Sequence, residues 1–520
     1  MKKILVFISL ITAFAVCAVS CTPAPAPAPV ENTQEQTEEA KDEVSAEVDT
    51  GEFAENETSG AEYENEFMQN EIQAIVEQAQ KGTLADYLKD TFTAAGGTVT
   101  EDGNGNIIID MPATEGNEGK EKVILQSSIN IPKDCKFEKD GDYIKSSGNP
   151  INSINAGGTA LAVYAATQCA NRGEIRIILT TTAEDGTLTA GALTPEILNC
   201  EKIINLNYYN TYAISNFGNG CNFYTISREL ETKPAELDTG MKISVNGLLG
   251  GYSYNTINSG RANAVKLMGS LLYCVKSKNI PFEIASVTGG SGANVLPAEC
   301  TAYINISSEN MQALTDAINE KSASFAEIYG SVETGLSTAS EQTEAPAGTV
   351  LEDTCKNSLI SILNALDSGV YSMSQSAYGY VESYINLGSV STEGGISLSY
   401  CIEAPTETFI DEIENSQETL EALTGFTAQV TPNRLPWLQK KDSALTQTAQ
   451  TVYQTQEGYE LYILPYVAKT EVFQIYGIVP NADIISIGCD VENPGTDMET
   501  LDTTTLQYPC NLLSGILSGM

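Results

Sequence analysis

The chain of 520 residues contains no histidine. Histidine is the commonest protein ligand for transition metals and the usual general base near neutral pH. Its absence excludes a serine or cysteine triad that depends on histidine, and it excludes a zinc site with a histidine ligand. Ser127 and Ser128 therefore have no evident partner base, and the sequence does not predict a serine nucleophile.

Basic residues are scarce as well. The chain has 27 Lys and Arg against 68 Asp and Glu, which gives a net charge of −41. Such a balance argues against a nucleic acid partner, because the phosphate backbone needs a basic surface. The 12 cysteines include no C-x-x-C pair and no zinc-like spacing, and their pairing cannot be deduced. An export signal would allow some of them to form disulfides.

Long apolar runs are missing except at the N-terminus. Lys2 and Lys3 precede an apolar run over Ile4–Val19, which is typical of a secretory signal peptide over residues 1–20. Small residues then lead to Cys21, as in a bacterial lipobox. The pattern predicts an exported protein anchored to a membrane by lipid on Cys21, in the periplasm or at the cell surface. The alternative is an ordinary signal peptide followed by an incidental cysteine.

A tether is predicted over residues 21–66. It begins with TPAPAPAPV, which favours extended polyproline geometry. Residues 31–66 then hold 14 acidic residues and one lysine, with few large apolar side chains. Such a segment buries too little surface to offset its ordering entropy, so we expect it to be disordered.

The remaining chain alternates strand and helix patterns. Strands are predicted over Asn106–Met111, Lys122–Gln126, Glu174–Thr182 and Glu201–Asn207, with a helix over Ala156–Cys169 and another helix before Glu201. This alternation favours an α/β sheet with parallel strands.

From about Phe217 the pattern becomes α+β. The predicted strands and helices of this part are Lys242–Val245, Arg261–Val275, Ala285–Val287, Thr301–Ile306 and Glu309–Ile328. A polar loop is predicted over residues 335–350. After Pro432 the α/β style returns, with strands over Tyr459–Leu464 and Ile484–Ile487. We therefore predict one domain inserted into another, with parts at 67–217, 218–431 and 432–520.

Five segments, taken in order, carry a resemblance to a known family. They are NGNIII with PAT (104–114), VILQSSIN (123–130), GLLGGYS with NSGRANAVKLM (247–268), GGSGANVLPAE (289–299) and SIGCDVENPGTDME (486–499). The set resembles the aminoacyl-histidine dipeptidases, which are di-zinc enzymes of the aminoacylase/carboxypeptidase superfamily. The resemblance implies an α/β fold of two domains, a catalytic-type α/β/α sandwich with an inserted α+β lid. It also allows a dimer.

The resemblance also implies where the family's chemistry should lie. That chemistry needs two zinc ions and a neighbouring glutamate base that activates water. The base position falls at Ala183. The five metal-ligand positions fall at Ser128, Ile154, Glu184, Asn207 and Gly495. Only Glu184 keeps a carboxylate, so no zinc ion and no other cofactor is expected.

Groups that the family uses around its substrate are altered too. The aspartate that orients the first histidine ligand falls at Asn130, and the lid histidine falls at Tyr252. One substrate arginine falls at Ala293, beside Asn294, and another falls at Glu403. The resemblance therefore implies that a dipeptide carboxylate meets an acid rather than a guanidinium. A further family glutamate, after a turn of uncertain alignment, falls near Lys469.

Three functions remain open. The first is an inactive peptidase fold that binds a peptide or small polar ligand in the former cleft, or whose cleft is a packed relic. Its candidate ligand-binding residues are Asn130, Asn155, Glu184, Tyr252, Asn294 and Glu403. The second is a hydrolase with a relocated carboxylate metal site, built from Glu184, Asp185, Asp490, Glu492, Asp497 and Glu499. The third is an interaction protein that acts through its lid.

Overall fold

The computed structural model describes residues 57–147, 150–375, 379–467, 470–494 and 498–520. The chain divides into two units, Met1–Ala54 and Glu55–Met520, and the second is compact by itself. The predicted signal peptide, Cys21 and most of the tether lie outside the described residues, as do Lys469, Gly495 and Asp497. No helix in the described ranges is long and apolar enough to cross a membrane.

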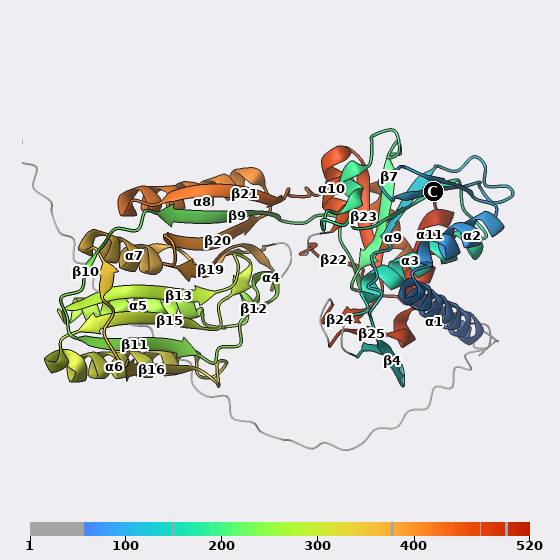
Figure 1. The fold of residues 1–520 in the computed structure, drawn as a ribbon. Coiled ribbons are helices and arrows are strands. Elements are labelled where there is room, and N and C mark those ends of the chain that lie inside the picture. The colour runs from blue at the N-terminus through green and yellow to red at the C-terminus, as the bar shows by residue number, and fades with distance from the viewer. Residues whose placement is uncertain (1–56, 148–149, 376–378, 468–469, 495–497) are drawn as a thin grey trace, which may run out of the picture. The chain divides into compact units, whose positions relative to one another are not determined.

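The first large sheet has six strands in the order β1-β2-β6-β3-β7-β23 (Figure 1). Their bounds are Thr98–Glu101, Ile107–Met111, Ile175–Thr180, Val123–Ser128, Lys202–Tyr208 and Asp483–Gly488. β6, β3, β7 and β23 run parallel, whereas β1 and β2 form an antiparallel edge. The last strand comes from near the C-terminus, so both ends of the compact unit build this sheet.

Helices cover both faces of this sheet, which explains why its parallel strands are apolar throughout. Leu125, Ile177 and Ile204 face a core that includes α1, α2, α3, α9 and α11. Ile124, Ile178 and Ile203 face a second core that includes α10 and the 3₁₀ helix η1. The bounds of these elements are Glu57–Lys81, Leu84–Ala94, Ser153–Thr167, Ala444–Glu457, Gln507–Ser518, Glu471–Ile478 and Thr189–Ala192.

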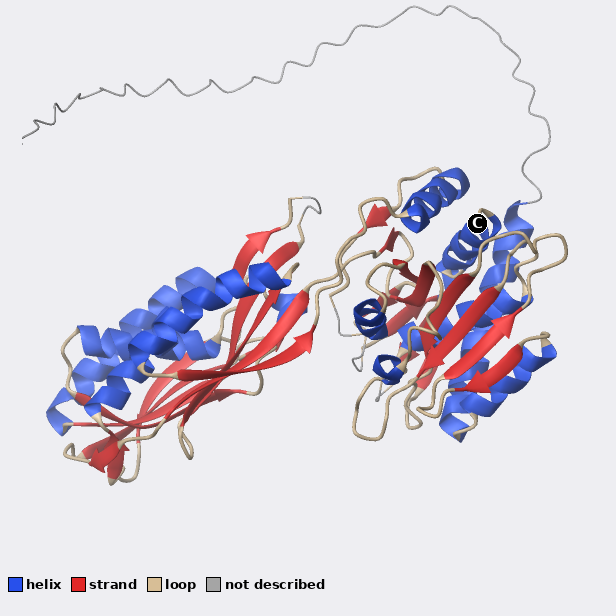
Figure 2. Ribbon diagram, turned by 90° about the horizontal axis from the view of Figure 1, so that it is seen from above, coloured by secondary structure: helices blue, strands red, loops and turns tan. Residues whose placement is uncertain are grey.

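The second large sheet has nine strands, eight of them in the order β16-β11-β15-β13-β19-β20-β9-β21 with β18 paired to β19. In that order, with β18 last, their bounds are Ser337–Gln342, Thr239–Asn246, Cys300–Ile306, Phe282–Gly290, Val381–Ser391, Ile396–Ala404, Gly220–Arg228, Thr427–Arg434 and Gly369–Met373. Helices lie on one face of this sheet (Figure 2), and their buried residues share its core. They are α5 (Ala264–Ser277), α6 (Met311–Tyr329), α7 (Asp353–Ala365) and α8 (Glu407–Thr424).

Smaller ladders complete the fold. One has the order β24-β25-β5-β4, and the pairs β10-β17, β12-β14 and β22-β8 stand alone. In chain order from β4 their bounds are Phe137–Asp140, Tyr143–Ser146, Ala213–Ile214, Thr232–Pro234, Gly251–Tyr252, Val295–Leu296, Thr349–Leu351, Tyr462–Ile463, Val491–Glu492 and Thr500–Asp502. The remaining helices are α4 (Ser253–Thr256), η2 (Ser308–Asn310) and η3 (Thr503–Thr505).

The predicted α/β fold with a second, α+β part is confirmed, and three local predictions are wrong. Residues 57–66 belong to α1 rather than to a disordered tether, because the apolar side of this helix packs on α3. The polar loop at 335–350 contains β16, which pairs with β11 at the edge of the large sheet. The α-helix predicted before Glu201 is not present, since residues 181–201, between β6 and β7, contain η1 and turns but no α-helix.

Candidate functional site

The residues at the predicted metal positions gather at the carboxyl edge of the six-stranded sheet. Ser128 ends β3, and Asn207 lies one residue before the end of β7. Ile154 lies in the first turn of α3. Open α/β sheets place their ligand sites at this edge, because strand ends and helix starts meet there. Ser128 and Asn207 are nevertheless almost fully buried.

The side-chain amide of Asn207 closes this edge. Its Oδ1 accepts a hydrogen bond from the Ser128 backbone N–H at 2.9 Å. Its Nδ2 lies 3.2 Å from each of three acceptors, the Ser127 hydroxyl, the Ile154 carbonyl and the Asn155 Oδ1. The two amide hydrogens are therefore shared by three acceptors, and Oδ1 also accepts a hydrogen bond, so both ends of the amide are engaged with the protein.

The neighbouring amides are engaged with the protein in the same way. Asn155 donates from Nδ2 to the Asn130 carbonyl at 3.0 Å, and its Oδ1 accepts from Asn207. Asn152 donates to the same Asn130 carbonyl at 2.9 Å. The side chain of Asn130 is exposed. The structure thus brings Ser128, Ile154, Asn207, Asn155 and the backbone of Asn130 together in one self-satisfied network.

Sequence reasoning missed an acid at this edge. Glu471, the first residue of α10, is 5% exposed and accepts a hydrogen bond from the Ser128 hydroxyl. Burial raises the pKa of this carboxyl, and hydrogen bonds from its own backbone and from Ser128 act in the opposite direction. The resemblance put a family glutamate near Lys469, two residues from Glu471. Because the alignment there is loose, it did not identify Glu471 itself. Ser128 has an acidic partner after all, but both groups are buried.

The predicted carboxylate cluster is not assembled by the described residues. Glu184 lies in an exposed turn after β6, together with Asp185. Glu499 is buried and accepts hydrogen bonds from the Ser153 backbone N–H at 2.8 Å and from the Ser153 hydroxyl at 2.7 Å, so it caps α3. Within the described ranges no three Asp, Glu or Cys side chains come close enough to hold a metal ion.

The lid positions Tyr252 and Asn294 lie close together. The β12-β14 ladder pairs Tyr252 with Val295. The Asn294 carbonyl accepts hydrogen bonds from the Ser253 backbone N–H at 2.8 Å and from the Ser253 hydroxyl at 3.1 Å. Tyr252 is 53% exposed, and its ring stacks on Tyr254 with centroids 5.6 Å apart. The structure therefore presents a stacked aromatic pair at the predicted lid position, with Tyr252 exposed and Tyr254 half-buried.

Glu403 is not the bare acid that the sequence suggested. It is 3% exposed, and its carboxylate lies 2.9 Å from the Arg434 guanidinium and accepts a hydrogen bond from the Tyr384 hydroxyl at 2.9 Å. Burial raises the pKa of Glu403, while Arg434 and the hydrogen bonds from Tyr384 and Asn219 act in the opposite direction. The guanidinium beside this position belongs to Arg434, at the end of β21, and it is paired with Glu403 itself.

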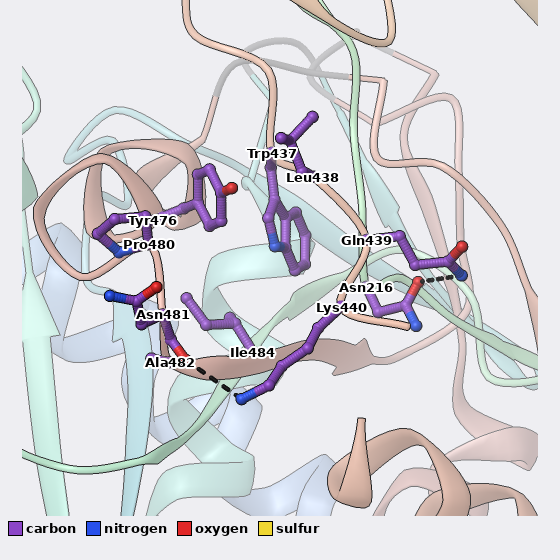
Figure 3. Close-up of a pocket in the computed structure, with 10 residues that line it drawn as sticks. All are labelled: Asn216, Trp437, Leu438, Gln439, Lys440, Tyr476, Pro480, Asn481, Ala482 and Ile484. Atoms are coloured by element: carbon purple, nitrogen blue, oxygen red, sulfur yellow. Dashed lines mark hydrogen bonds between the residues drawn. The ribbon is translucent and has the colours of Figure 1, made fainter. Parts of the chain in front are cut away.

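Of two pockets in the structure, one is lined by a predicted site residue and the other is not. One of about 330 Å³ is lined by Tyr209, Tyr254, Tyr380, Tyr384 and Glu403, among others, and so includes a predicted lid position. Another of about 170 Å³ surrounds Trp437, and none of the predicted site residues lines it (Figure 3). There Lys440 donates to the Asn481 carbonyl and Gln439 donates to Asn216.

Comparisons with known proteins agree with the resemblance. Residues 243–333 match the family model of the peptidase dimerisation domain. The chain is 25% identical over 452 residues to the cytosol non-specific dipeptidase of Escherichia coli (strain K12), covering 84% of this chain and 92% of that protein. The crystal structure of aminoacylhistidine dipeptidase from Vibrio alginolyticus aligns with a TM-score of 0.73 at 23% identity, covering 86% of this chain and 96% of that one.

These similarities define the class of fold. The chain has the two-part α/β fold of the dipeptidase-type metallopeptidases, and it is similar in sequence to the aminoacyl-histidine and cytosol non-specific dipeptidases.

Glu471 predicts a specific pH dependence of stability. Its folded-state pKa lies above the reference value of 4.5, so the folded protein binds more protons than the unfolded chain just above pH 4.5. Its contribution to stability is therefore present at low pH and is lost as the pH rises through the folded pKa. Glu471→Gln should remove this loss, leaving unfolding free energies equal to or above wild type at pH 7. Urea denaturation from pH 4 to 8 measures it, and an unchanged pH profile in the variant would contradict the assignment.

The Glu403–Arg434 pair predicts strong non-additivity. Arg434→Met leaves a buried carboxylate without its partner and should cost about 3–5 kcal/mol. Glu403→Gln leaves the guanidinium unpaired and should cost a similar amount, whereas the double variant should lose far less than the sum. Chemical denaturation of the four proteins in the cycle measures the coupling. Additive losses would show that the two groups do not depend on each other.

Proposed function

We propose that this chain is a catalytically inactive relative of the metallodipeptidases that binds a peptide or small polar ligand. The observation that carries the proposal is the side-chain amide of Asn207, a neutral group whose oxygen and nitrogen are both hydrogen-bonded to the protein. Its Oδ1 is directed at the Ser128 backbone N–H, and its Nδ2 at three protein acceptors, where a metal site would need an anionic ligand directed at the ion. The neighbouring position Ile154 has an alkyl side chain that cannot coordinate a metal.

The absence of a general base supports the same proposal. The family's base position is Ala183, which is exposed and carries no titratable group. Glu471 is an acid beside Ser128, but it is buried and its carboxylate is hydrogen-bonded by the Ser128 hydroxyl. A general base must reach a proton of the substrate or of a water bound beside it. Glu471 faces the closed network instead.

A ligand-binding role is supported by the pocket that includes Glu403. Its volume of about 330 Å³ falls at the lower end of the range for small-molecule sites. The pocket lies on the lid side of the site, where side chains such as Asn255 and Asn258 are exposed and able to form hydrogen bonds. We therefore propose that the sheet edge at Ser128 and Asn207 is closed to ligands, whereas the pocket on the lid side is open to them.

We also propose that the protein is exported and held at a membrane by lipid on Cys21, in the periplasm or at the cell surface. The signal-like sequence of residues 1–20 and the small residues before Cys21 support this proposal. A dimer is proposed as well, on the similarity of residues 243–333 to the peptidase dimerisation domain.

Metal content and hydrolysis test the inactive assignment. The chain from Glu57 onward, carrying a tag without histidine, should retain less than about a tenth of an equivalent of zinc or manganese after incubation and desalting. It should not release amino acids from dipeptides under conditions in which the Escherichia coli relative does. Elemental mass spectrometry and an amine-release assay measure both. One or two tightly bound metal equivalents together with turnover would overturn the assignment.

Cys21→Ser tests the anchor. The full chain expressed in a bacterial host should fractionate with membranes and incorporate labelled fatty acid, because two or more acyl chains hold a protein firmly at a bilayer. The Cys21→Ser variant should lose the label and move to the soluble fraction. Cys17→Ser, within the apolar run, is the matched control and should behave as wild type. Equal labelling of Cys21→Ser and wild type would rule out this lipidation site.

A further inference from the structure

The lid pocket has an unusual lining for a relative of enzymes that bind dipeptides. Four tyrosines line it, namely Tyr209, Tyr254, Tyr380 and Tyr384, together with the carboxylate of Glu403. Among the described residues that line it, there is no lysine and no arginine. Aromatic faces and a carboxylate are the groups that proteins use to hold organic cations.

Glu403 lines this pocket as the carboxylate end of its ion pair with Arg434. The sheet register places Arg434, Cys221, Glu403 and Tyr384 in one row across β21, β9, β20 and β19. Arg434 therefore reaches Glu403 over the intervening Cys221 and is itself buried behind it. Glu403 and Tyr384 line the pocket, and Arg434 does not.

The tyrosines supply neutral rings and hydroxyls. Burial raises the pKa of Tyr209 to about 12, and the nearby hydroxyls of Tyr380 and Tyr254 add to the shift. Burial likewise raises the pKa of Tyr254 and of Tyr380. The three hydroxyl groups are therefore un-ionised at neutral pH and close enough to influence one another. Their rings keep the negative face that attracts cations, and their hydroxyls accept hydrogen bonds.

The charge of the whole chain acts in the same direction. A net charge of −41 raises the local concentration of positive ligands and repels carboxylates. The positions at which the family resemblance implied substrate arginines are Ala293 and Glu403, so no guanidinium from these positions faces an incoming ligand. Both the long-range field and the local lining therefore favour a cation over the carboxylate of a dipeptide.

We infer that this tyrosine-lined pocket binds an organic cation, an ammonium or guanidinium group on a flexible chain. The inference deepens the proposed ligand-binding function and rests on it. The ligand's charged group lies against the tyrosine rings on the Glu403 side, and Asn255 and Asn258 serve neighbouring polar groups of the same ligand. The cation comes either from a basic side chain of a peptide or from a free polyamine.

Calorimetric titration of the chain from Glu57 onward tests the inference, since this part forms a compact unit by itself. The probes are spermidine, the blocked tripeptide Gly-Arg-Gly and the same tripeptide with neutral citrulline in place of arginine. We expect at least one cationic probe to bind about tenfold or more tightly than the citrulline peptide, with an affinity that falls as salt rises. Binding of the arginine peptide alone identifies a peptide source, and binding of spermidine alone identifies a polyamine.

Ring substitutions locate the binding. Tyr254→Leu should weaken the cationic probe about tenfold, whereas Tyr254→Phe, which keeps the ring, should stay within about threefold of wild type. Tyr459→Leu is the control, because Tyr459 is 75% exposed and lies outside the pocket. Circular dichroism confirms folding, and Tyr380→Leu serves as a second variant if Tyr254→Leu does not fold.

The outcomes separate this inference from the function on which it rests. Equal binding of the arginine and citrulline peptides, or no binding of any cation, overturns the inference while a metal-free, inactive protein keeps its assignment. Metal content with dipeptide turnover overturns the inactive assignment, and the Tyr254 series still decides whether the pocket takes a cation. Equal effects of Tyr254→Leu and Tyr459→Leu would also overturn the inference, because they would place binding elsewhere.

Discussion

The side-chain amide of Asn207 is the interaction on which the rest of the site depends. It joins the ends of β3 and β7 to the start of α3 through four hydrogen-bond partners. An asparagine can do this because it offers an acceptor and two donors on one planar group. An aspartate at the same place would have no donor for the Ile154 carbonyl or for Asn155, and it would be a buried charge without a metal. In the proposed inactive protein, this neutral amide links elements that the family resemblance would join through a metal centre.

The buried acids follow from the same constraint. A buried carboxylate needs hydrogen-bond donors or cations beside it. Each of three acids near the predicted site residues has such partners within the protein. Glu471 lies at the start of α10 and meets Ser128, Glu499 meets the backbone and hydroxyl of Ser153, and Glu403 meets Arg434. These partners all come from the protein itself, so no ion is needed to balance the three carboxylates. Of the three acids, only Glu403 is among the described residues that line the tyrosine pocket.

Much of this could be predicted from the sequence, because apolar runs such as Lys122–Gln126 report buried strands directly. The resemblance assigned Ser128, Ile154 and Asn207 to metal-ligand positions, and the structure brings these three residues together. The pairing of Glu403 with Arg434 could not be predicted, since it depends on a bulge in the pairing of β21 with β9. Glu471 was not identified because the family motif near Lys469 aligns only loosely with this sequence. The polar β16 has no apolar alternation, and it forms because β11 offers an unpaired edge.

The proposed inactivity and the residues at the lid positions have one electrostatic consequence. A pair of divalent ions is the largest local charge in a site, and it attracts carboxylates and repels cations. Under the proposed function, Asn207 and Ile154 supply no such positive centre at the sheet edge. Glu403 and Ala293 stand where the resemblance implied positive groups on the lid. The described lining of the tyrosine pocket holds the Glu403 carboxylate and no cationic side chain, and the Arg434 guanidinium that pairs with Glu403 is not part of that lining, so in a chain with a net charge of −41 the proposed pocket favours a cation over a carboxylate.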